Sequence, residues 1–123
     1  MPDNTGKLAG LRILIAEDDG LIAEDLRVSI EREDATVDMA STVAQALALL
    51  DRFILNGVIL DCRLVNEASV TVAAALSLRQ IPYVVVTGYA AEVLPVELRG
   101  APYLAKPFRS RDLIEMAVRH FRR

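Results

Sequence analysis

Short runs of apolar residues alternate along the chain with longer segments in which apolar residues recur at helical spacing. Three runs are mostly apolar, as expected for strands buried on both faces of a sheet: 12–16, 58–60 and 83–86. The run 35–39 alternates apolar and polar residues, which is typical of a strand nearer the edge of a sheet. The run 101–105 is a fifth candidate strand, and its proline also suits an edge position.

Helical patterns fill the spaces between these strands. Asp19 is a candidate N-cap for a first helix whose apolar residues lie four apart: Ile22, Leu26 and Ile30. Thr42 and Gln45 match a capping box that opens a second helix, and a third helix is predicted over 67–79. Ser110 is the predicted cap of the last helix, whose apolar stripe consists of Leu113, Ile114, Ala117, Val118 and Phe121.

Residues 88–100 give the weakest helical pattern. Gly88 weakens a helix start, Pro95 cannot donate an N–H inside a helix, and Gly100 follows soon after. We therefore expect a short or irregular fourth helix here, with few apolar residues to bury. This segment is also expected to be the least ordered internal part of the chain.

Strands that alternate with helices predict an α/β fold, with a doubly wound parallel sheet and helices on both of its faces. Residues 1–9 are polar and contain glycine, so we interpret them as a flexible lead-in to one domain over 10–123. Ligands of such sheets bind beyond the carboxyl ends of the strands. Candidate chemistry is therefore sought at the residues that follow each strand.

Composition narrows the class of protein. The chain has 123 residues, of which 53% are hydrophobic and 25% charged, which is ordinary for one folded domain and excludes intrinsic disorder. The net charge of -3 argues against a direct role in binding nucleic acid. The longest mostly apolar stretch, 68–78, is too short to cross a membrane, and no signal peptide is recognised. With one cysteine, Cys62, which we interpret as a small apolar residue of the core or a loop, a cytoplasmic location fits best.

Acidic residues follow two of the predicted strands. Glu17, Asp18 and Asp19 end the first strand, and Asp61 ends the third. Carboxylates packed together repel one another unless a cation joins them, and hard oxygen ligands suit Mg²⁺. We interpret Asp19 as a helix cap and the other three as the candidate metal site.

The remaining strand ends carry a hydroxyl and an ammonium group. Thr87 ends the fourth strand, and Lys106 ends the fifth, directly before Pro107. A carboxylate held rigidly at the end of a buried strand, as expected for Asp61, can act as a nucleophile toward a phosphoryl group. Lys106 and Thr87 would then bind phosphoryl oxygens.

Four segments, in this order, resemble the receiver domains of bacterial two-component response regulators, which are CheY-like: 13–19, 58–61, 86–87 and 103–108. The resemblance covers residues 11–121. It implies a flavodoxin-like five-stranded sheet of order 2-1-3-4-5. It also implies that Asp61 accepts a phosphoryl group from a phosphohistidine of a sensor histidine kinase or a phosphotransfer protein.

The same resemblance implies further roles around Asp61. Asp18 and Asp61 would ligate Mg²⁺ directly, Glu17 would act through water, and the backbone carbonyl of Arg63 would complete the metal site. Phosphorylation would draw Thr87 inward, and Tyr103 would turn to fill the space, which switches the binding of a downstream protein. The domain would then have only self-phosphorylation and self-dephosphorylation chemistry.

Two departures from the usual receiver pattern concern the loops. Many receivers carry a Met-Pro pair after the acceptor, whereas this chain has Cys-Arg-Leu-Val-Asn-Glu over 62–67. The tripeptide Thr-Gly-Tyr over 87–89 matches the end of the string Phe-Ala-Thr-Gly-Tyr, which marks a subgroup that often lacks a full fourth helix. The departures concern the usual signalling surface rather than the phosphorylation chemistry.

Two alternatives stay open: a receiver-like interaction module that takes no phosphate, and a phosphatase with an aspartate nucleophile. Such phosphatases usually need a second carboxylate two residues after the nucleophile, and Arg63 stands there. A free-standing regulator and a piece of a larger hybrid kinase are both compatible with the sequence, as is a weak homodimer.

Overall fold

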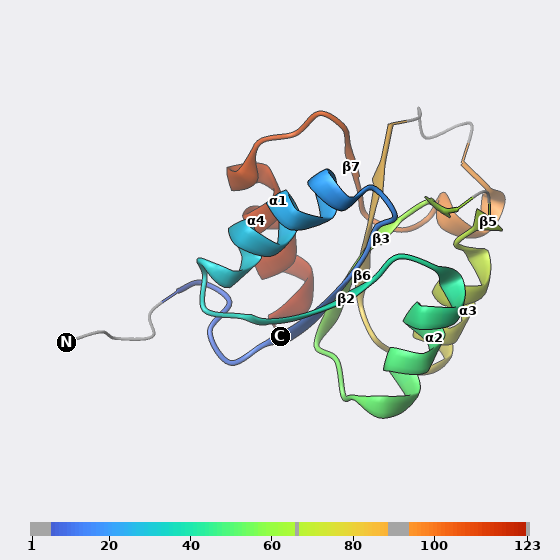
Figure 1. The fold of residues 1–123 in the computed structure, drawn as a ribbon, viewed down its shortest axis with the longest axis horizontal. Helices are drawn as coiled ribbons and strands as arrows, with labels where there is room; N and C mark the ends of the chain where they lie inside the picture. The colour runs from blue at the N-terminus through green and yellow to red at the C-terminus, as the bar shows by residue number, and fades with distance from the viewer. Residues whose placement is uncertain (1–5, 66, 89–93, 123) are drawn as a thin grey trace.

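The computed structural model describes residues 6–65, 67–88 and 94–122 and contains a five-stranded parallel sheet (Figure 1). Its strand order is β2-β1-β3-β6-β7, which confirms the predicted doubly wound sheet of order 2-1-3-4-5 when only these five strands are counted. The bounds are β1 (Arg12–Ala16), β2 (Thr36–Ala40), β3 (Gly57–Asp61), β6 (Tyr83–Thr87) and β7 (Tyr103–Ala105). In the register, Ile13 of β1 lies between Val37 and Gly57.

Two pairs of helices cover the two faces of the sheet (Figure 1). On one face lie α1 (Gly20–Glu31) and α4 (Ser110–Phe121), and on the other lie α2 (Val43–Arg52) and α3 (Val70–Leu78). Within the described parts of the chain, no helix is long and apolar enough to cross a membrane.

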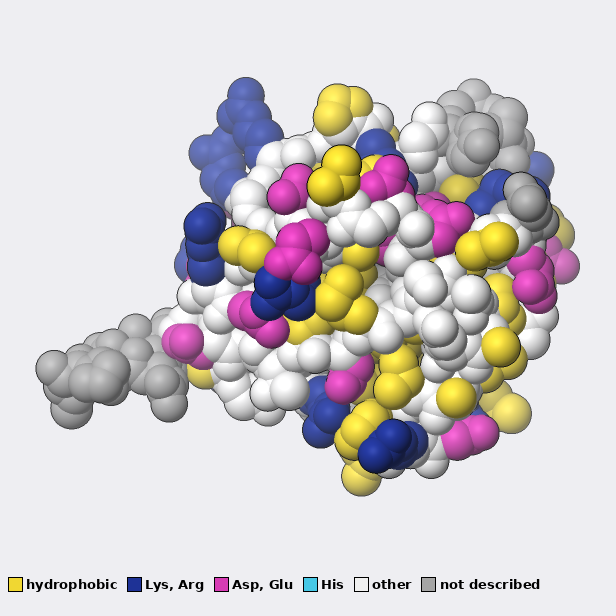
Figure 2. Space-filling view, in the orientation of Figure 1, with side chains coloured by type: hydrophobic (Ala, Val, Ile, Leu, Met, Phe, Trp, Pro, Cys, Tyr) yellow, Lys and Arg dark blue, Asp and Glu magenta, His cyan; other side chains and the backbone are white. Residues whose placement is uncertain are grey.

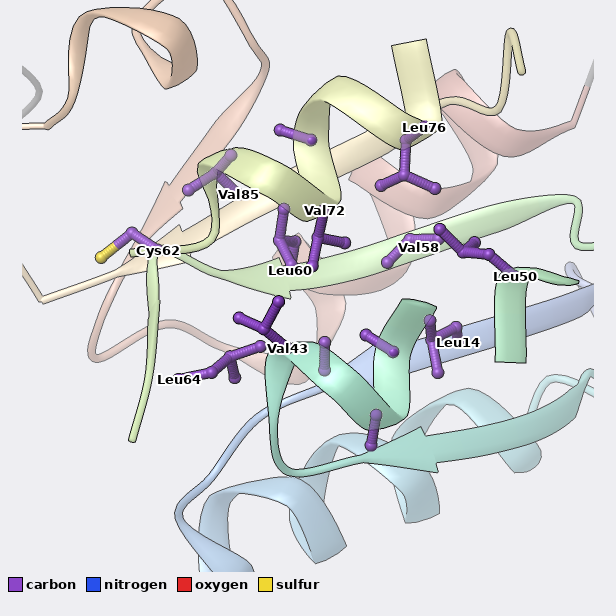
Figure 3. Packing of buried hydrophobic residues seen from close by; sticks show 14 of the residues in the cluster. Leu14, Val43, Leu50, Val58, Leu60, Cys62, Leu64, Val72, Leu76 and Val85 are labelled. Atoms are coloured by element: carbon purple, nitrogen blue, oxygen red, sulfur yellow. The ribbon is translucent and has the colours of Figure 1, made fainter. Parts of the chain in front are cut away.

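Successive strand residues point to opposite faces, so the sheet separates two cores. Ile13, Ile15 and Ile59 pack against helices α1 and α4, and we call this core the α1–α4 cluster. Leu14, Val58 and Leu60 pack against helices α2 and α3 in the core that we call the α2–α3 cluster (Figure 3). Burial on both faces explains why β1, β3 and β6 read as continuous apolar runs.

Two of the predicted caps are present. Asp19 Oδ1 accepts hydrogen bonds from the N–H groups of Leu21 (2.9 Å) and Ile22 (3.1 Å) at the start of α1. Thr42 Oγ1 accepts one from the N–H of Gln45 (3.1 Å) at the start of α2. The other half of the predicted capping box is displaced by one residue, because Gln45 Oε1 accepts from the N–H of Ser41 (2.8 Å).

The predicted cap of the last helix is wrong. Helix α4 begins at Ser110 itself, Arg109 occupies the N-cap position, and no side chain caps this end. The Ser110 hydroxyl instead donates to Ser29 Oγ of α1 (2.8 Å). This serine therefore joins two neighbouring helices, because it lies within the first turn and faces α1.

A small hairpin precedes α3 and shortens the helix predicted over 67–79. Strand β4 (Arg63–Leu64) pairs antiparallel with β5 (Glu67–Ala68), and the helix begins only at Val70. Val65 in the turn has a positive φ of 47°, which a β-branched residue adopts only when its surroundings require it. The hairpin replaces the first turn of the expected helix.

Residues 6–8, part of the lead-in predicted over 1–9, are hydrogen-bonded to the turn that follows α1. Leu8 is fully buried in the α1–α4 cluster, and its N–H donates to the carbonyl of Glu33 (3.0 Å). A lone apolar residue in a polar segment gave too little pattern to predict this anchor. The rest of the predicted lead-in, 1–5, lies outside the described residues.

The chain between β6 and β7 agrees with the expected short, irregular fourth helix. Its only helix within residues 88 and 94–100 is the 3-10 helix η2 (Val96–Leu98). The expectation of few buried apolar residues is wrong, because Leu94 and Leu98 are at most 2% exposed and belong to the α2–α3 cluster. The least ordered segment was expected over 88–100, and its residues 89–93 lie outside the described part.

Candidate functional site

Three carboxylates lie together at the carboxyl ends of β1 and β3. One oxygen atom from each of Glu17, Asp18 and Asp61 lies within 4.8 Å of the other two. Glu17 is 3% exposed and Asp61 is 8% exposed, whereas Asp18 is open to solvent. Figure 2 shows acidic side chains grouped on the surface near the point where β1 runs into α1. The three predicted acidic residues are thus brought together, and Asp19 turns to the helix cap instead.

Lys106, which directly follows the edge strand β7, also contacts this cluster. Its Nζ lies 3.0 Å from Glu17 Oε1 and 3.2 Å from Asp61 Oδ2. Its backbone N–H donates to the carbonyl of Thr87 (2.7 Å), which extends the β6–β7 pairing past the last strand residue. The ammonium group is therefore held by its own backbone beside both buried carboxylates.

The surroundings shift the pKa values of two groups in the cluster. Burial raises the pKa of Glu17 to about 7, and the neighbouring Asp61 carboxyl adds to this rise, while the Asp19 N–H and Lys106 oppose it. Burial alone would lower the pKa of Lys106, but the hydrogen bond to Glu17 and the charge of Asp61 outweigh burial and raise it. Both carboxylates thus favour the charged form of Lys106.

Backbone donors fix the orientation of the carboxylates. The Val65 N–H donates to Asp18 Oδ2 (2.8 Å), and the Asp19 N–H donates to Glu17 Oε2 (3.1 Å). Arg63, predicted to supply a carbonyl to the metal, donates its own N–H to Asp61 Oδ1 (3.4 Å). The contribution of Val65 was missed, because a backbone donor leaves no side-chain signature in a sequence.

Ser69 was also missed by the sequence reasoning. It is fully buried, and its hydroxyl donates to the backbone carbonyl of Asp61 (2.5 Å). This bond ties the start of α3 to the end of β3, which holds the Asp61 backbone in place. A serine before a helix reads as an N-cap, and Ser69 does stand at the N-cap position of α3 without forming a side-chain cap.

The two predicted switch residues lie on neighbouring strands. Thr87 at the end of β6 is fully buried, and its Oγ1 accepts a hydrogen bond from Cys62 Sγ (3.3 Å). Tyr103 lies in β7 opposite Val85, and it is 43% exposed. The structure thus places a buried hydroxyl at the carboxyl edge of the sheet and a half-exposed ring on the next strand.

The donor set fits a divalent cation with a preference for oxygen ligands. Three carboxylates carry up to three negative charges, and Lys106 offsets one of them. Mg²⁺ is commonly held by one or two carboxylates together with water or phosphate oxygens. An exposed Asp18 beside two buried carboxylates leaves one side of the cluster open to such ligands.

Comparisons with known proteins agree with this geometry. The family model described as the response regulator receiver domain matches residues 13–118. The transcriptional regulatory protein PdtaR of Mycobacterium tuberculosis is 34% identical over 119 residues, which cover 90% of this chain and 58% of that protein. The chain therefore spans little more than half the length of this relative.

Two solved structures extend the likeness to three dimensions. A CheY-like response regulator receiver domain protein from Methanospirillum hungatei has a TM-score of 0.78 at 32% identity, covering 86% of this chain and 89% of that chain. A response regulator protein from Burkholderia pseudomallei, solved with a phosphorylated aspartic acid, a calcium ion and citrate, has a TM-score of 0.77 at 26% identity. This match covers 88% of this chain and 65% of that chain.

Proposed function

Since the chain belongs to the response regulator receiver domain family, we propose that it is a phosphoacceptor domain in which Asp61 takes a phosphoryl group. The donor would be a phosphohistidine of a sensor histidine kinase or a phosphotransfer protein. The observation that carries the proposal is the pairing of a nearly buried Asp61 carboxylate with Lys106 Nζ at 3.2 Å.

This pairing supports nucleophilic attack on phosphorus. An Asp61 oxygen would form the new P–O bond as the P–N bond to the histidine breaks, and the histidine nitrogen would take the electron pair. The product is an acyl phosphate, which water later hydrolyses back to the carboxylate. Lys106 would offset the charge on the phosphoryl oxygens, which is the main contribution that a protein makes to this kind of transfer.

A divalent cation would complete the site. Asp18, Asp61 and the backbone carbonyl of Arg63 would hold Mg²⁺, with Glu17 acting through water. Bound there, the ion supplies further neutralisation of phosphoryl charge. The Burkholderia pseudomallei relative, with its phosphorylated aspartic acid and calcium ion, supports the same combination of acceptor and cation.

The output of the domain would be a change in partner binding rather than turnover of a substrate. Thr87 would donate to a phosphoryl oxygen, and the Tyr103 ring, now 43% exposed, would turn inward. Arg63 stands where an aspartate-nucleophile phosphatase needs its second carboxylate, and its side chain is exposed in β4. We place this signalling domain in the cytoplasm, with a downstream protein as its partner.

The test is labelling with radioactive acetyl phosphate in the presence of Mg²⁺. We expect Asp61→Asn to take no label, because the amide keeps the shape of the carboxylate without its nucleophilicity. Asp51→Asn is the matched control: Asp51 is an exposed aspartate of α2 that pairs with Arg79, and it should be dispensable. Label on Asp61→Asn equal to that on the wild type would contradict the assignment.

The time course separates this function from the two alternatives. A switch accumulates at most one phosphoryl group per chain, and the label then stays level because slow hydrolysis balances the transfer. A phosphatase would release phosphate continuously while carrying little label. An interaction module that takes no phosphate would stay unlabelled at every concentration of acetyl phosphate.

A further inference from the structure

Cys62 lies beside the proposed phosphorylation site without a role in it. The register that places Asp61 opposite Val86 brings Cys62 next to Thr87 on the adjacent strand. The Cys62 N–H donates to the carbonyl of Val86 (3.3 Å), and its own carbonyl accepts from the N–H of Ser69 (3.0 Å). Both backbone groups are bonded, so the backbone of Cys62 and the direction of its Cα–Cβ bond are fixed.

The Cys62 side chain has polar as well as apolar contacts. It is 2% exposed and belongs to the α2–α3 cluster. Figure 3 shows its sulfur turned away from Leu60 and Val72, the core side chains behind it. The sulfur lies 3.3 Å from Thr87 Oγ1, a distance that fits a thiol donor. A cysteine thiol is a weak donor, so it can donate to the hydroxyl oxygen at this distance.

A threonine hydroxyl has one proton and two lone pairs. When the Cys62 thiol donates into one lone pair, the proton of the Thr87 hydroxyl must point away from the sulfur. Asp61 precedes Cys62 in the chain, so a phosphoryl group on its carboxylate would present oxygens at the same edge of the sheet. A hydroxyl whose rotation is already restricted donates to such an oxygen at a lower entropic cost.

We propose that Cys62 is a positioning residue that orients the Thr87 hydroxyl toward a phosphoryl group on Asp61. The inference rests on the proposed function and adds to it a contact that regulates the stability of the phosphorylated state. Cys62 does not touch the phosphoryl group in this proposal. Its effect passes through Thr87 alone.

The experiment measures the affinity of beryllium fluoride, a phosphoryl mimic, by calorimetry at saturating Mg²⁺. Cys62→Val removes the donor and keeps a small apolar side chain, and Cys62→Ala does so with a smaller volume. Each of these two variants should bind beryllium fluoride about threefold to tenfold more weakly than the wild type, the range expected for one hydrogen bond. Cys62→Ser restores a donor and should bind the mimic more tightly than Cys62→Val.

The deciding experiment measures the affinity for beryllium fluoride again, with Cys62→Val introduced into the Thr87→Ala variant. If Cys62 acts through the hydroxyl, Cys62→Val should not weaken the mimic further in that background. Val72→Ala is the control for packing, because Val72 is fully buried in the same cluster on α3. It should lower thermal stability without changing the affinity for the mimic.

Two results would overturn the inference. One is an affinity for beryllium fluoride that is unchanged in both Cys62→Val and Cys62→Ala. The other is a loss of affinity on Cys62→Val that is equally large with and without the Thr87 hydroxyl. The proposed function is tested separately by labelling of the wild type at Asp61. A wild type that takes no label would overturn both, whereas a labelled wild type with an unaffected Cys62→Val would overturn only the role of Cys62.

Discussion

Glu17 is held in two conflicting environments. Burial and the Asp61 carboxyl favour its protonated form, whereas Lys106 and the N–H of Asp19 favour its charged form. The balance raises its pKa to about 7, so the group changes charge near neutral pH. A cation at this site would favour the charged form, which links metal binding to the loss of a proton.

The raised pKa predicts that stability falls as pH rises in the absence of divalent cations. Between pH 4.5, the ordinary pKa of a glutamate, and about pH 7, Glu17 keeps a proton in the native state that it has released in the unfolded state. The free energy of unfolding should therefore fall across this window, by up to about 3 kcal/mol, with the full cost present above pH 7. Urea unfolding followed by circular dichroism from pH 5 to 8 measures it.

Glu17→Gln should remove this pH dependence, because the amide does not titrate in the window. Glu115→Gln, which changes an exposed carboxylate on α4, should retain it. Identical pH profiles for the wild type and Glu17→Gln would show that another group is responsible. Saturating Mg²⁺ should flatten the wild-type profile, since binding favours the charged carboxylate.

At the scale of elements, helix α4 depends on one glycine of the sheet. A Cβ atom added at Gly57 in β3 would overlap the ring of Phe121 near the end of α4. Phe121 is 3% exposed, and the overlap involves the inner atoms of its ring, which cannot move aside without shifting the helix. The absence of a side chain at Gly57 therefore allows the close approach of α4 to the sheet.

Gly57→Ala should destabilise the domain by about 1 to 3 kcal/mol, the usual cost of overpacking a core. Adding Phe121→Ala to Gly57→Ala should cost less than the about 3 to 5 kcal/mol usual for Phe→Ala in a core, because alanine lacks the Cγ and Cδ atoms that the added Cβ would overlap. Gly20→Ala serves as the control, since nothing lies within 4 Å of a Cβ at that helical position. Chemical denaturation measures all three, and a Gly57→Ala variant as stable as the wild type would contradict the packing argument.

The elements also show which features could be predicted from the sequence. The buried strands could be, because burial on both faces leaves a run such as Ile-Leu-Ile over 13–15. The start of α3 could not, because 70–78 is apolar on every side and its boundary depends on the β4–β5 hairpin. The burial of Leu94 and Leu98 was not predicted, because glycine and proline nearby weaken the helical pattern without preventing burial.

The residues of the candidate site also divide into those that could be predicted from the sequence and those that could not. Glu17, Asp61, Thr87 and Lys106 could be predicted, because the carboxyl ends of parallel strands meet at one edge of the sheet. The contacts of Val65 and Ser69 could not, because they depend on the path of the backbone through the hairpin. The Cys62–Thr87 bond required the register between β3 and β6, which no local pattern specifies.

At the scale of the whole molecule, a bound cation should stabilise the fold. A ligand that binds only the native state adds RT ln(1 + [L]/Kd), which is about 1.4 kcal/mol at ten times Kd. We expect Mg²⁺ to raise Tm by about 3 to 6 °C at that concentration. Differential scanning calorimetry with and without Mg²⁺ measures the shift.

Asp18→Ala should abolish this thermal shift, because Asp18 is the exposed member of the acidic cluster. Asp25→Ala, which removes an exposed carboxylate on α1, should keep the full shift. A shift of wild-type size in Asp18→Ala would remove this residue from the metal site.

The division of the core by the sheet has a consequence for signalling. Glu17 and Asp61 continue the strand positions that face the α1–α4 cluster, after Ile15 and Ile59, whereas Thr87 follows Val85 on the face of the α2–α3 cluster. A phosphoryl group on Asp61 that binds both Lys106 and Thr87 would connect these two layers. Phosphorylation would then alter both layers together, so a partner that docks on either side of the domain would respond to the same covalent event.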